Sequence, residues 1–340
     1  MLTDERQRLH SVNRSTISDE SAAAAAEAAA PAVVAPPGCR IGPVHLTTMQ
    51  GVAAGIAVII AAGLILGFGL DPPSKDPAPW ARVSAVIGWW YFTAWAISFL
   101  PQLYLNFTRK CVVGQSFDYV FMNVLGFLSY SIYTFSFYAV TEVQAEYKAR
   151  YGNSNNVELN DVVFAVYSFI CCMYNSYQIY AYDRGTQRVS KATVAGIVVA
   201  VCVMTVWSIT VAAGVHARYV FNSLDVLYGL SMLKLGVSLI KYLPQIYLNY
   251  TRQCTVGWNI WNVLLDFTGG SLSVAQELID CASRGDWNGI AGNPVKFGLG
   301  SLSMVYDVVF MLQHFVWYRA NNAQLHKGVV HVRTTQEDAE

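Results

Sequence analysis

The sequence has few charged residues for its length. Its 340 residues include 22 Lys plus Arg and 22 Asp plus Glu, so the formal net charge is zero, while 54% of the residues are hydrophobic. There is no basic stripe between the aromatics, which excludes a nucleic-acid surface, and no His/Cys cluster has the spacing of a metal site. The charges instead gather in short gaps between long apolar runs, a pattern typical of an integral membrane protein.

Seven apolar runs are long enough to cross a membrane as helices, since a span needs about 20 residues. They lie at 82–106, 117–139, 161–182, 191–213, 222–250, 258–280 and 296–318. A further hydrophobic segment at 47–70 is longer than most signal-peptide cores, so we expect an extra N-terminal transmembrane helix or signal anchor, with a cleaved signal as the alternative. The Ala-rich residues 1–46 are expected to form a mobile tail.

One fifteen-residue segment occurs twice. LPQLYLNFTRKCVVG begins at Leu100 and LPQIYLNYTRQCTVG begins at Leu243, and the two match at eleven of fifteen positions with an offset of 143. Internal repeats of this kind decide the architecture. Four predicted helices separate the copies, so both copies cross the membrane in the same direction.

The repeat predicts an all-α integral membrane fold of seven helices arranged as three plus one plus three. Its parts are a first repeat at 82–182, a linker helix at 191–213, a second repeat at 222–318 and a cytosolic tail at 319–340. Parallel repeats related by an axis along the membrane normal are one plan of transporters, whose substrate site lies near the midplane between the halves.

Each copy of the segment places a Pro-Gln pair inside an apolar helix, as Pro101-Gln102 and Pro244-Gln245. A proline removes one backbone hydrogen bond and permits a kink. Two kinks at equivalent places predict paired hinges. The alternative is that both prolines are merely tolerated because neighbouring helices satisfy the freed backbone groups.

Ionisable side chains inside the spans indicate a functional site, because a charge within a membrane is costly. These residues are Lys234, Lys241, Asp266 and Asp307. The offset of 143 pairs Asp266 with Asn123, so only the second repeat can ionise at this place. A carboxyl buried in a low dielectric takes up a proton readily, which makes Asp266 and Asp307 candidate proton carriers. The alternative is a buried Lys–Asp pair that only fixes helix packing.

Three stretches carry a family resemblance. They are LPQLYLNFTRKCVVGQSFDYVFMNVLGF in the first repeat, NVLLDFTGGS in the sixth predicted helix and MVYDVVFMLQHF in the seventh. Over about residues 84–318 the chain resembles the cystinosins, which are lysosomal cystine/proton symporters of the PQ-loop family, and NVLLDFTGGS is closer to them than to the sugar-carrying SWEET relatives. The resemblance implies a PQ-loop/SWEET-like transporter, not an enzyme, that exports L-cystine and protons from a lysosomal or vacuolar lumen without a cofactor.

The resemblance also implies roles for particular residues. Proton coupling falls on Asp266, Asp307 and Asp161, which opens the third predicted helix. Substrate binding falls on Asn123, Asn262, Asp266, Lys234 and Lys241, with Gln102 and Gln245 beside the hinge prolines. Cystine has two ammonium and two carboxylate groups, so a cavity that holds lysines, carboxylates and amides can pair with both of its ends.

The excess of Lys and Arg in alternate loops predicts that Arg184, Arg188 and the C-terminus face the cytosol. Other classes fit less well: a seven-helix receptor lacks the repeat, and the Gly-x-Gly-Asp motif of an intramembrane aspartyl protease does not occur around Asp266. Two alternatives stay open on the same fold. One is a transporter of another amino acid or a sugar, and the other is a retrieval receptor or sensor that carries nothing.

Overall fold

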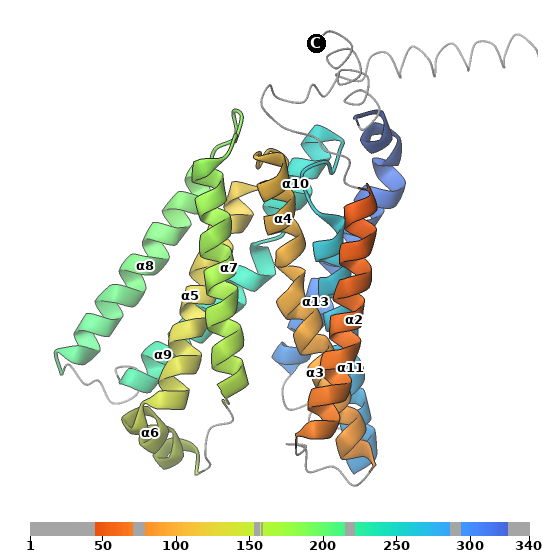
Figure 1. Ribbon diagram of the computed structural model, residues 1–340. Helices are drawn as coiled ribbons and strands as arrows, with labels where there is room; N and C mark the ends of the chain where they lie inside the picture. Colours follow the sequence, from red (N-terminus) through yellow and green to blue (C-terminus); the bar gives the residue numbers. More distant parts are fainter. Residues whose placement is uncertain are drawn as a thin grey trace, which may run out of the picture. The chain divides into compact units, whose positions relative to one another are not determined.

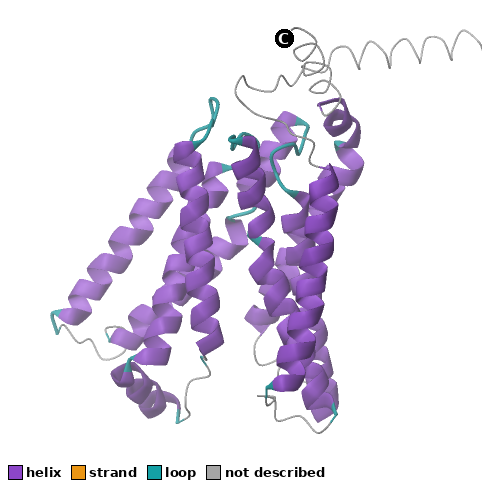
Figure 2. Cartoon of the chain, viewed as in Figure 1, coloured by secondary structure: helices purple, strands orange, loops and turns teal. Residues whose placement is uncertain are grey.

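The computed structural model describes residues 45–70, 79–152, 157, 159–214, 222–285 and 294–325. These residues form helices joined by short turns and loops (Figure 2). They belong to one compact unit, 36–340, and the other unit, 1–35, lies outside the described residues. The expected N-terminal tail lies outside them too, apart from 45 and 46, as does the tail beyond 325.

The first repeat begins with a helix that is broken at the proline. α3 (Trp80–Ser98) ends two residues before α4 (Leu100–Arg109) begins, and Pro101 lies in the first turn of α4. A proline fits there because its missing N–H would have no partner within the helix. The other helices of this repeat are α5 (Phe117–Ala139), α6 (Thr141–Tyr151) and α7 (Leu159–Ala181).

The second repeat has the same break. α9 (Ser223–Ile240) is followed by α10 (Leu243–Arg252), with Pro244 in its first turn. Both short helices end on a residue in the left-handed region, Lys110 with φ 51° and Gln253 with φ 49°. α8 (Lys191–Ala212) lies between the two repeats in the sequence, and the second repeat continues with α11 (Ile260–Arg284), α13 (Pro294–Leu312) and the π-helix η1 (Gln313–Trp317).

The long helices of the two repeats pack across each other. α3 packs against both α2 (His45–Gly69) and α11, and α5 packs against both α7 and α9; these helices are labelled in Figure 1. α11 also packs against α13. Helices of the first repeat therefore contact helices of the second along two seams, which brings side chains of both repeats together.

The segment 47–70 is helical and packs closely on α3. Gly63 and Gly67 of α2 lie where a Cβ would collide with Trp90 and Val86 of α3. Arg82 donates hydrogen bonds to the carbonyls of Gly67 at 2.9 Å and Leu70 at 2.6 Å, which satisfies the end of α2. Small residues at such contacts let two helices approach closely.

Five segments of the described chain are long and apolar enough to cross a membrane, at 80–109, 117–139, 161–181, 191–212 and 223–252. The sequence predicted seven spans and an extra helix. α11 and α13 occupy the two remaining predicted stretches. α11 is less apolar than the five, because it carries a polar stripe that packs against neighbouring helices. One member of the stripe, Gln276, donates to the Ser84 carbonyl of α3 at 2.9 Å.

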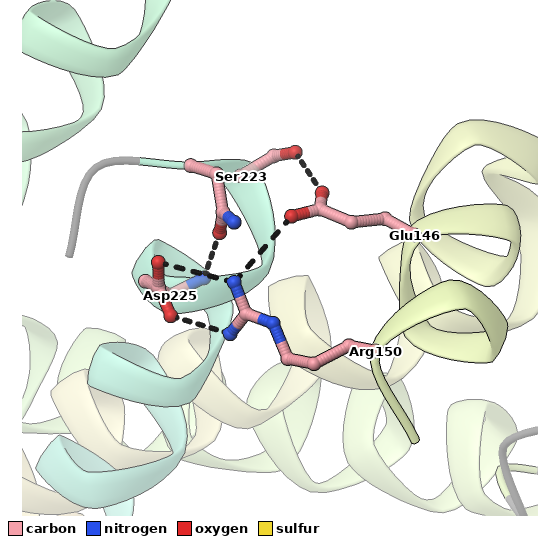
Figure 3. Close-up of polar contacts among 5 residues, drawn as sticks. Glu146, Arg150, Ser223 and Asp225 are labelled. Carbon is pink, nitrogen blue, oxygen red and sulfur yellow. Dashed lines mark hydrogen bonds and ion pairs between the residues drawn. The ribbon is translucent and has the colours of Figure 1, made fainter. Parts of the chain in front are cut away.

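Hydropathy did not predict α6, because its sequence TEVQAEYKARY is polar. Arg150 of α6 donates to Asp225 of α9 at 2.7 Å and lies 3.8 Å from Glu146, while Ser223 donates to Glu146 at 3.0 Å (Figure 3). Beneath these contacts Val143 packs in a buried cluster with residues of α5 and α9. α6 thus joins the end of the first repeat's second helix to the start of the second repeat.

Candidate functional site

The glutamine of the first Pro-Gln pair binds the loop of the second repeat. The side-chain amide of Gln102 donates to the Gly257 carbonyl at 3.0 Å, and its carbonyl oxygen accepts from the Asn259 backbone N–H at 2.8 Å. Asn259 in turn donates through its side chain to the Pro101 carbonyl at 2.7 Å. The loop before α11 is therefore fixed by the start of α4.

The glutamine of the second pair makes the reciprocal contacts. Gln245 donates to the Gly114 carbonyl at 3.0 Å and accepts from the Ser116 backbone N–H at 2.6 Å. Gly114 and Ser116 are the equivalents of Gly257 and Asn259 at the offset of 143. Gln245 is completely buried, and a buried amide that loses its partner costs about 1–3 kcal/mol. The two Pro-Gln helices thus hold each other's following loops.

Two asparagines extend this network to the third helix of each repeat. Asn106 donates to Gln178 of α7 at 3.0 Å, and Asn249 donates to Gln313 of η1 at 2.9 Å. Each glutamine then donates back to its own Pro-Gln helix, Gln178 to the Leu103 carbonyl and Gln313 to the Ile246 carbonyl. Gln178 and Gln313 are therefore equivalent residues, 135 positions apart in the sequence.

Asp266 accepts two hydrogen bonds in a cluster built mainly by the second repeat. The Tyr242 hydroxyl donates to its Oδ2 at 2.7 Å, and Ser303 of α13 donates to the same oxygen at 3.3 Å. Asp307 follows Ser303 by one helical turn and is almost completely buried. Its Oδ2 has no hydrogen-bond partner among the described residues, so it is available to a proton or a ligand.

Lys234 of α9 and Lys241, which directly follows α9, both point toward α5. Lys234 Nζ lies 3.9 Å and Lys241 Nζ lies 5.9 Å from the centre of the Phe127 ring. Lys241 also donates to Asn123 of α5 at 3.2 Å. No ion pair joins Lys241 to Asp266 within the described part of the chain, so the alternative of a direct Lys–Asp pair that fixes packing is not what the structure contains.

Internal symmetry shows how the two halves of this region differ. The equivalences of 143 and 135 pair Lys241 with Ser98, Tyr242 with Phe99, Asp266 with Asn123 and Asp307 with Cys172. Every titratable carboxyl and ammonium group of these pairs lies in the second repeat. The region is therefore symmetric in backbone and asymmetric in charge.

A small cavity of about 20 Å³, lined by both apolar and polar side chains, lies beside this region between the two repeats. Its lining includes Gln102, Gln115, Asn123, Asn175 and Asn262. Such a volume holds about one water molecule. The amide nitrogen of Gln115 is buried and has no hydrogen-bond partner among the described residues. A molecule of amino-acid size would need the cavity to open.

The structure thus brings most of the predicted site residues together. Asn123, Lys241 and Asp266 lie within one network of contacts, and Asn262 lines the adjoining cavity. Asp161 is apart from them, because it lies in the first turn of α7, 14 residues before Asn175. That separation is about 21 Å along a helix.

Sequence reasoning missed several residues of this site. They are Tyr242, Ser303, Asn106, Asn249, Gln178 and Gln313. The offset of 143 pairs Tyr242 with Phe99, just as it pairs Asp266 with Asn123. A hydroxyl present in only the second repeat was therefore a signal that the sequence offered. Gln178 and Gln313 gave none, because their spacing of 135 does not follow the main repeat.

A family model described as the PQ loop repeat matches residues 83–141 and 226–284. These two ranges contain both Pro-Gln helices and most of the helices that carry the site. The protein is therefore an all-helical membrane protein with several apolar spans and two PQ-loop repeats.

Three curated relatives define the family more closely. The chain is 44% identical to cystinosin of Drosophila melanogaster, over 69% of this chain and 58% of that protein. It is 40% identical to the cystinosin homolog of Dictyostelium discoideum, over 70% and 82%, and 24% identical to the cystine transporter of Saccharomyces cerevisiae, over 71% and 95%. The chain spans less than two thirds of the length of the fly relative. It belongs to the cystinosin family.

Proposed function

We propose that this protein exports L-cystine together with protons from a lysosomal or vacuolar lumen to the cytosol. Two three-helix repeats joined by α8 would alternate between lumen-open and cytosol-open states. The observation that carries the proposal is the charged cluster around Asp266, which lies where the two repeats meet. Its family supports the same substrate, since one relative is named a cystine transporter.

The chemistry of the cluster suits a substrate with paired charges. The ammonium groups of Lys234 and Lys241 would bind carboxylates of cystine, while Asn123 and Asn262 would donate or accept hydrogen bonds at its polar ends. Lys241 is held by Asn123, and within the described ranges it forms no ion pair that would have to break before it binds substrate. That arrangement lowers the cost of exchanging a protein contact for a substrate contact.

Protons would be carried by the second repeat. Asp266 is the first candidate, because its equivalent in the first repeat is an asparagine that cannot ionise. Asp307 is the second, since one of its buried carboxylate oxygens has no partner among the described residues. Asp161 would act separately from Asp266 and Asp307, because it lies in the first turn of α7.

The orientation proposed here follows the Lys and Arg distribution. Arg109 and Arg252 are the last residues of the two Pro-Gln helices and Arg184 follows the end of α7, and all three would face the cytosol together with the C-terminus. The Pro-Gln breaks at Pro101 and Pro244 would then act as hinges near the cytosolic ends of their helices.

Uptake of labelled cystine into proteoliposomes under an imposed proton gradient tests the function. We expect labelled cystine to accumulate. A protonophore should abolish this accumulation, and unlabelled cystine should reduce it by competition. Stronger competition by another amino acid or a sugar would favour a transporter of that solute. Saturable cystine binding without flux would contradict transport and favour a sensor or retrieval receptor.

A further inference from the structure

Tyr242 occupies the two-residue break between α9 and α10. α9 ends at Ile240 and α10 begins at Leu243, so Tyr242 belongs to neither helix. Its hydroxyl donates to Asp266 Oδ2 at 2.7 Å, and the side chain is 5% exposed. A residue at one of the two predicted hinges is therefore bonded directly to the predicted proton carrier.

The ring of Tyr242 is held on several sides. Its centre lies 5.5 Å from the rings of Tyr119 and Tyr306 and 5.8 Å from that of Phe310. The ammonium of Lys241 lies 4.5 Å above the ring centre. A cation over the ring face is attracted to it and draws electron density from the ring, which makes the hydroxyl a stronger donor. A hydrogen bond from such a donor to an ionised carboxylate is stronger than a hydrogen bond between two neutral groups.

The first repeat provides an internal comparison. Phe99 occupies the position of Tyr242, and Asn123 occupies that of Asp266. Phe99 lies at the equivalent break and packs on Phe127 and Tyr167. The break and the aromatic ring are therefore common to both repeats, whereas the hydroxyl is present only in the repeat whose partner residue can ionise.

We propose that Tyr242 is a positioning residue that couples the charge of Asp266 to the break between α9 and α10. Ionised Asp266 holds the hydroxyl, and through it the break, by a charge-assisted hydrogen bond. A proton taken up on the carboxylate removes the charge and weakens that bond, which frees the break to change its angle. This inference rests on the proposed proton-coupled function and adds the residue that transmits the proton to the hinge.

Other titratable groups also face Asp266. From the elements packed around it these are Lys234 of α9, Lys241 of the break after α9, Asp307 of α13 and Tyr119 of α5. Tyr91 of α3 lies close enough to Asp161 of α7, and to Asp280 and Glu277 further along α11, to interact with them electrostatically. Any of these groups can influence the protonation of Asp266, so the test must separate the hydroxyl from the surrounding charges. Substituting Tyr242 by Phe removes the hydroxyl and leaves all of them in place.

Infrared difference spectra of the full chain in lipid vesicles measure carboxyl protonation directly. As the buffer pH is lowered, the C=O band of a protonated carboxyl grows, and Asp266→Asn identifies which band belongs to Asp266. Tyr242→Phe should move the midpoint of that band to higher pH by roughly one to two units, the equivalent of one lost hydrogen bond to a charged group. Phe fits the equivalent place in the first repeat, so this variant is expected to fold.

Tyr167→Phe is the matched control. It removes a hydroxyl that donates to the Ala96 carbonyl at 2.9 Å, away from Asp266, and should leave the midpoint unchanged. An unchanged midpoint in Tyr242→Phe, or an equal shift in Tyr167→Phe, overturns the inference. Labelled cystine uptake measured on the same vesicles reports the proposed function independently: an absence of uptake with a shifted midpoint refutes the function and leaves the Tyr242–Asp266 link intact.

Discussion

Gly114 and Gly257 meet backbone to backbone, each with a φ of +103°. A Cβ added to either glycine would lie 2.9 Å from the Cα of the other. The two loops that follow the Pro-Gln helices are therefore in direct contact where Gln102 and Gln245 hold them. Each position requires glycine for two reasons: its backbone conformation has a positive φ, and the close approach leaves no room for a Cβ.

Gly114→Ala should destabilise the protein strongly. Positive φ costs an L-residue about 1–2 kcal/mol, and forcing a methyl group into backbone adds roughly 1–3 kcal/mol of overpacking. We expect a clear fall of the thermal unfolding temperature in detergent, measured by fluorescence. Gly196→Ala is the control, because Gly196 lies in α8 with open space around its Cβ position; it should be neutral or stabilising. Equal unfolding temperatures for the two variants would show that the loops can separate freely.

The Pro-Gln breaks predict an effect on rate rather than on binding. With Pro101→Ala or Pro244→Ala the chain regains a backbone donor and loses a ring that disfavours a continuous helix by about 3 kcal/mol or more. A straighter helix should slow cystine transport about tenfold or more, while cystine binding changes little. Radiolabelled uptake and equilibrium binding on the same preparations measure both.

Pro79→Ala serves as the control for the hinge variants, since Pro79 precedes α3 outside the apolar helix. Its uptake should equal that of the unmodified protein. Unchanged uptake in both hinge variants would mean that the two breaks do not move during transport, and that their prolines are only tolerated.

The sequence predicted the helices of both repeats well, because their apolar runs are long and the two copies of the repeat place corresponding helices at corresponding positions. It did not predict α6, which has too few apolar residues to produce a signal, or which loops the two glutamines bind. A repeat reveals that Gln102 and Gln245 are equivalent, but equivalence does not reveal contact. Gln102 and Gly257 lie 155 positions apart, and only the packed structure shows that the partners are exchanged between repeats.

The contact between Arg150 and Asp225 predicts a modest local effect. The hydrogen bond from Arg150 to Asp225 raises the pKa of Arg150 above its ordinary value. The guanidinium therefore stays charged at neutral pH, and the stability that its raised pKa contributes is lost as the pH rises through that pKa. The Arg150 side chain is 31% exposed, which limits such a pair to about 1 kcal/mol.

Arg150→Ala should therefore increase amide hydrogen exchange in α6 by at most about fivefold, measured by mass spectrometry. Lys148→Ala is the control, since this exposed lysine of the same helix forms no ion pair within the described residues. The buried residues beneath α6 should keep the helix folded in both variants. Complete loss of protection in Arg150→Ala would show that the ionic contacts, rather than the apolar cluster, hold α6 in place.

Asp266→Asn should uncouple transport from protons. The variant mimics the neutral carboxyl permanently, and asparagine already fills the equivalent position 123 of the first repeat, so the fold should tolerate it. Tyr242 and Ser303 can still donate to the amide oxygen, but no charge changes during the cycle. Proton-driven accumulation of cystine should fall by at least about tenfold, because the linkage of one proton over one pH unit corresponds to a tenfold change in an equilibrium.

The measurement is cystine uptake at a series of imposed pH gradients, with cystine exchange at equal pH as a second readout. Asp266→Asn should retain slow exchange and lose the dependence on the gradient. Asp118→Asn is the matched control, because it also removes one carboxylate. Asp118 accepts a hydrogen bond from the Ser190 backbone N–H at 2.7 Å and lies outside the charged cluster. Cystine uptake by this variant should still follow the pH gradient. Accumulation of cystine by Asp266→Asn against its own gradient would assign the coupling proton to another group. Asp307 would be the next residue to replace, because its buried Oδ2 has no hydrogen-bond partner among the residues that the structure describes.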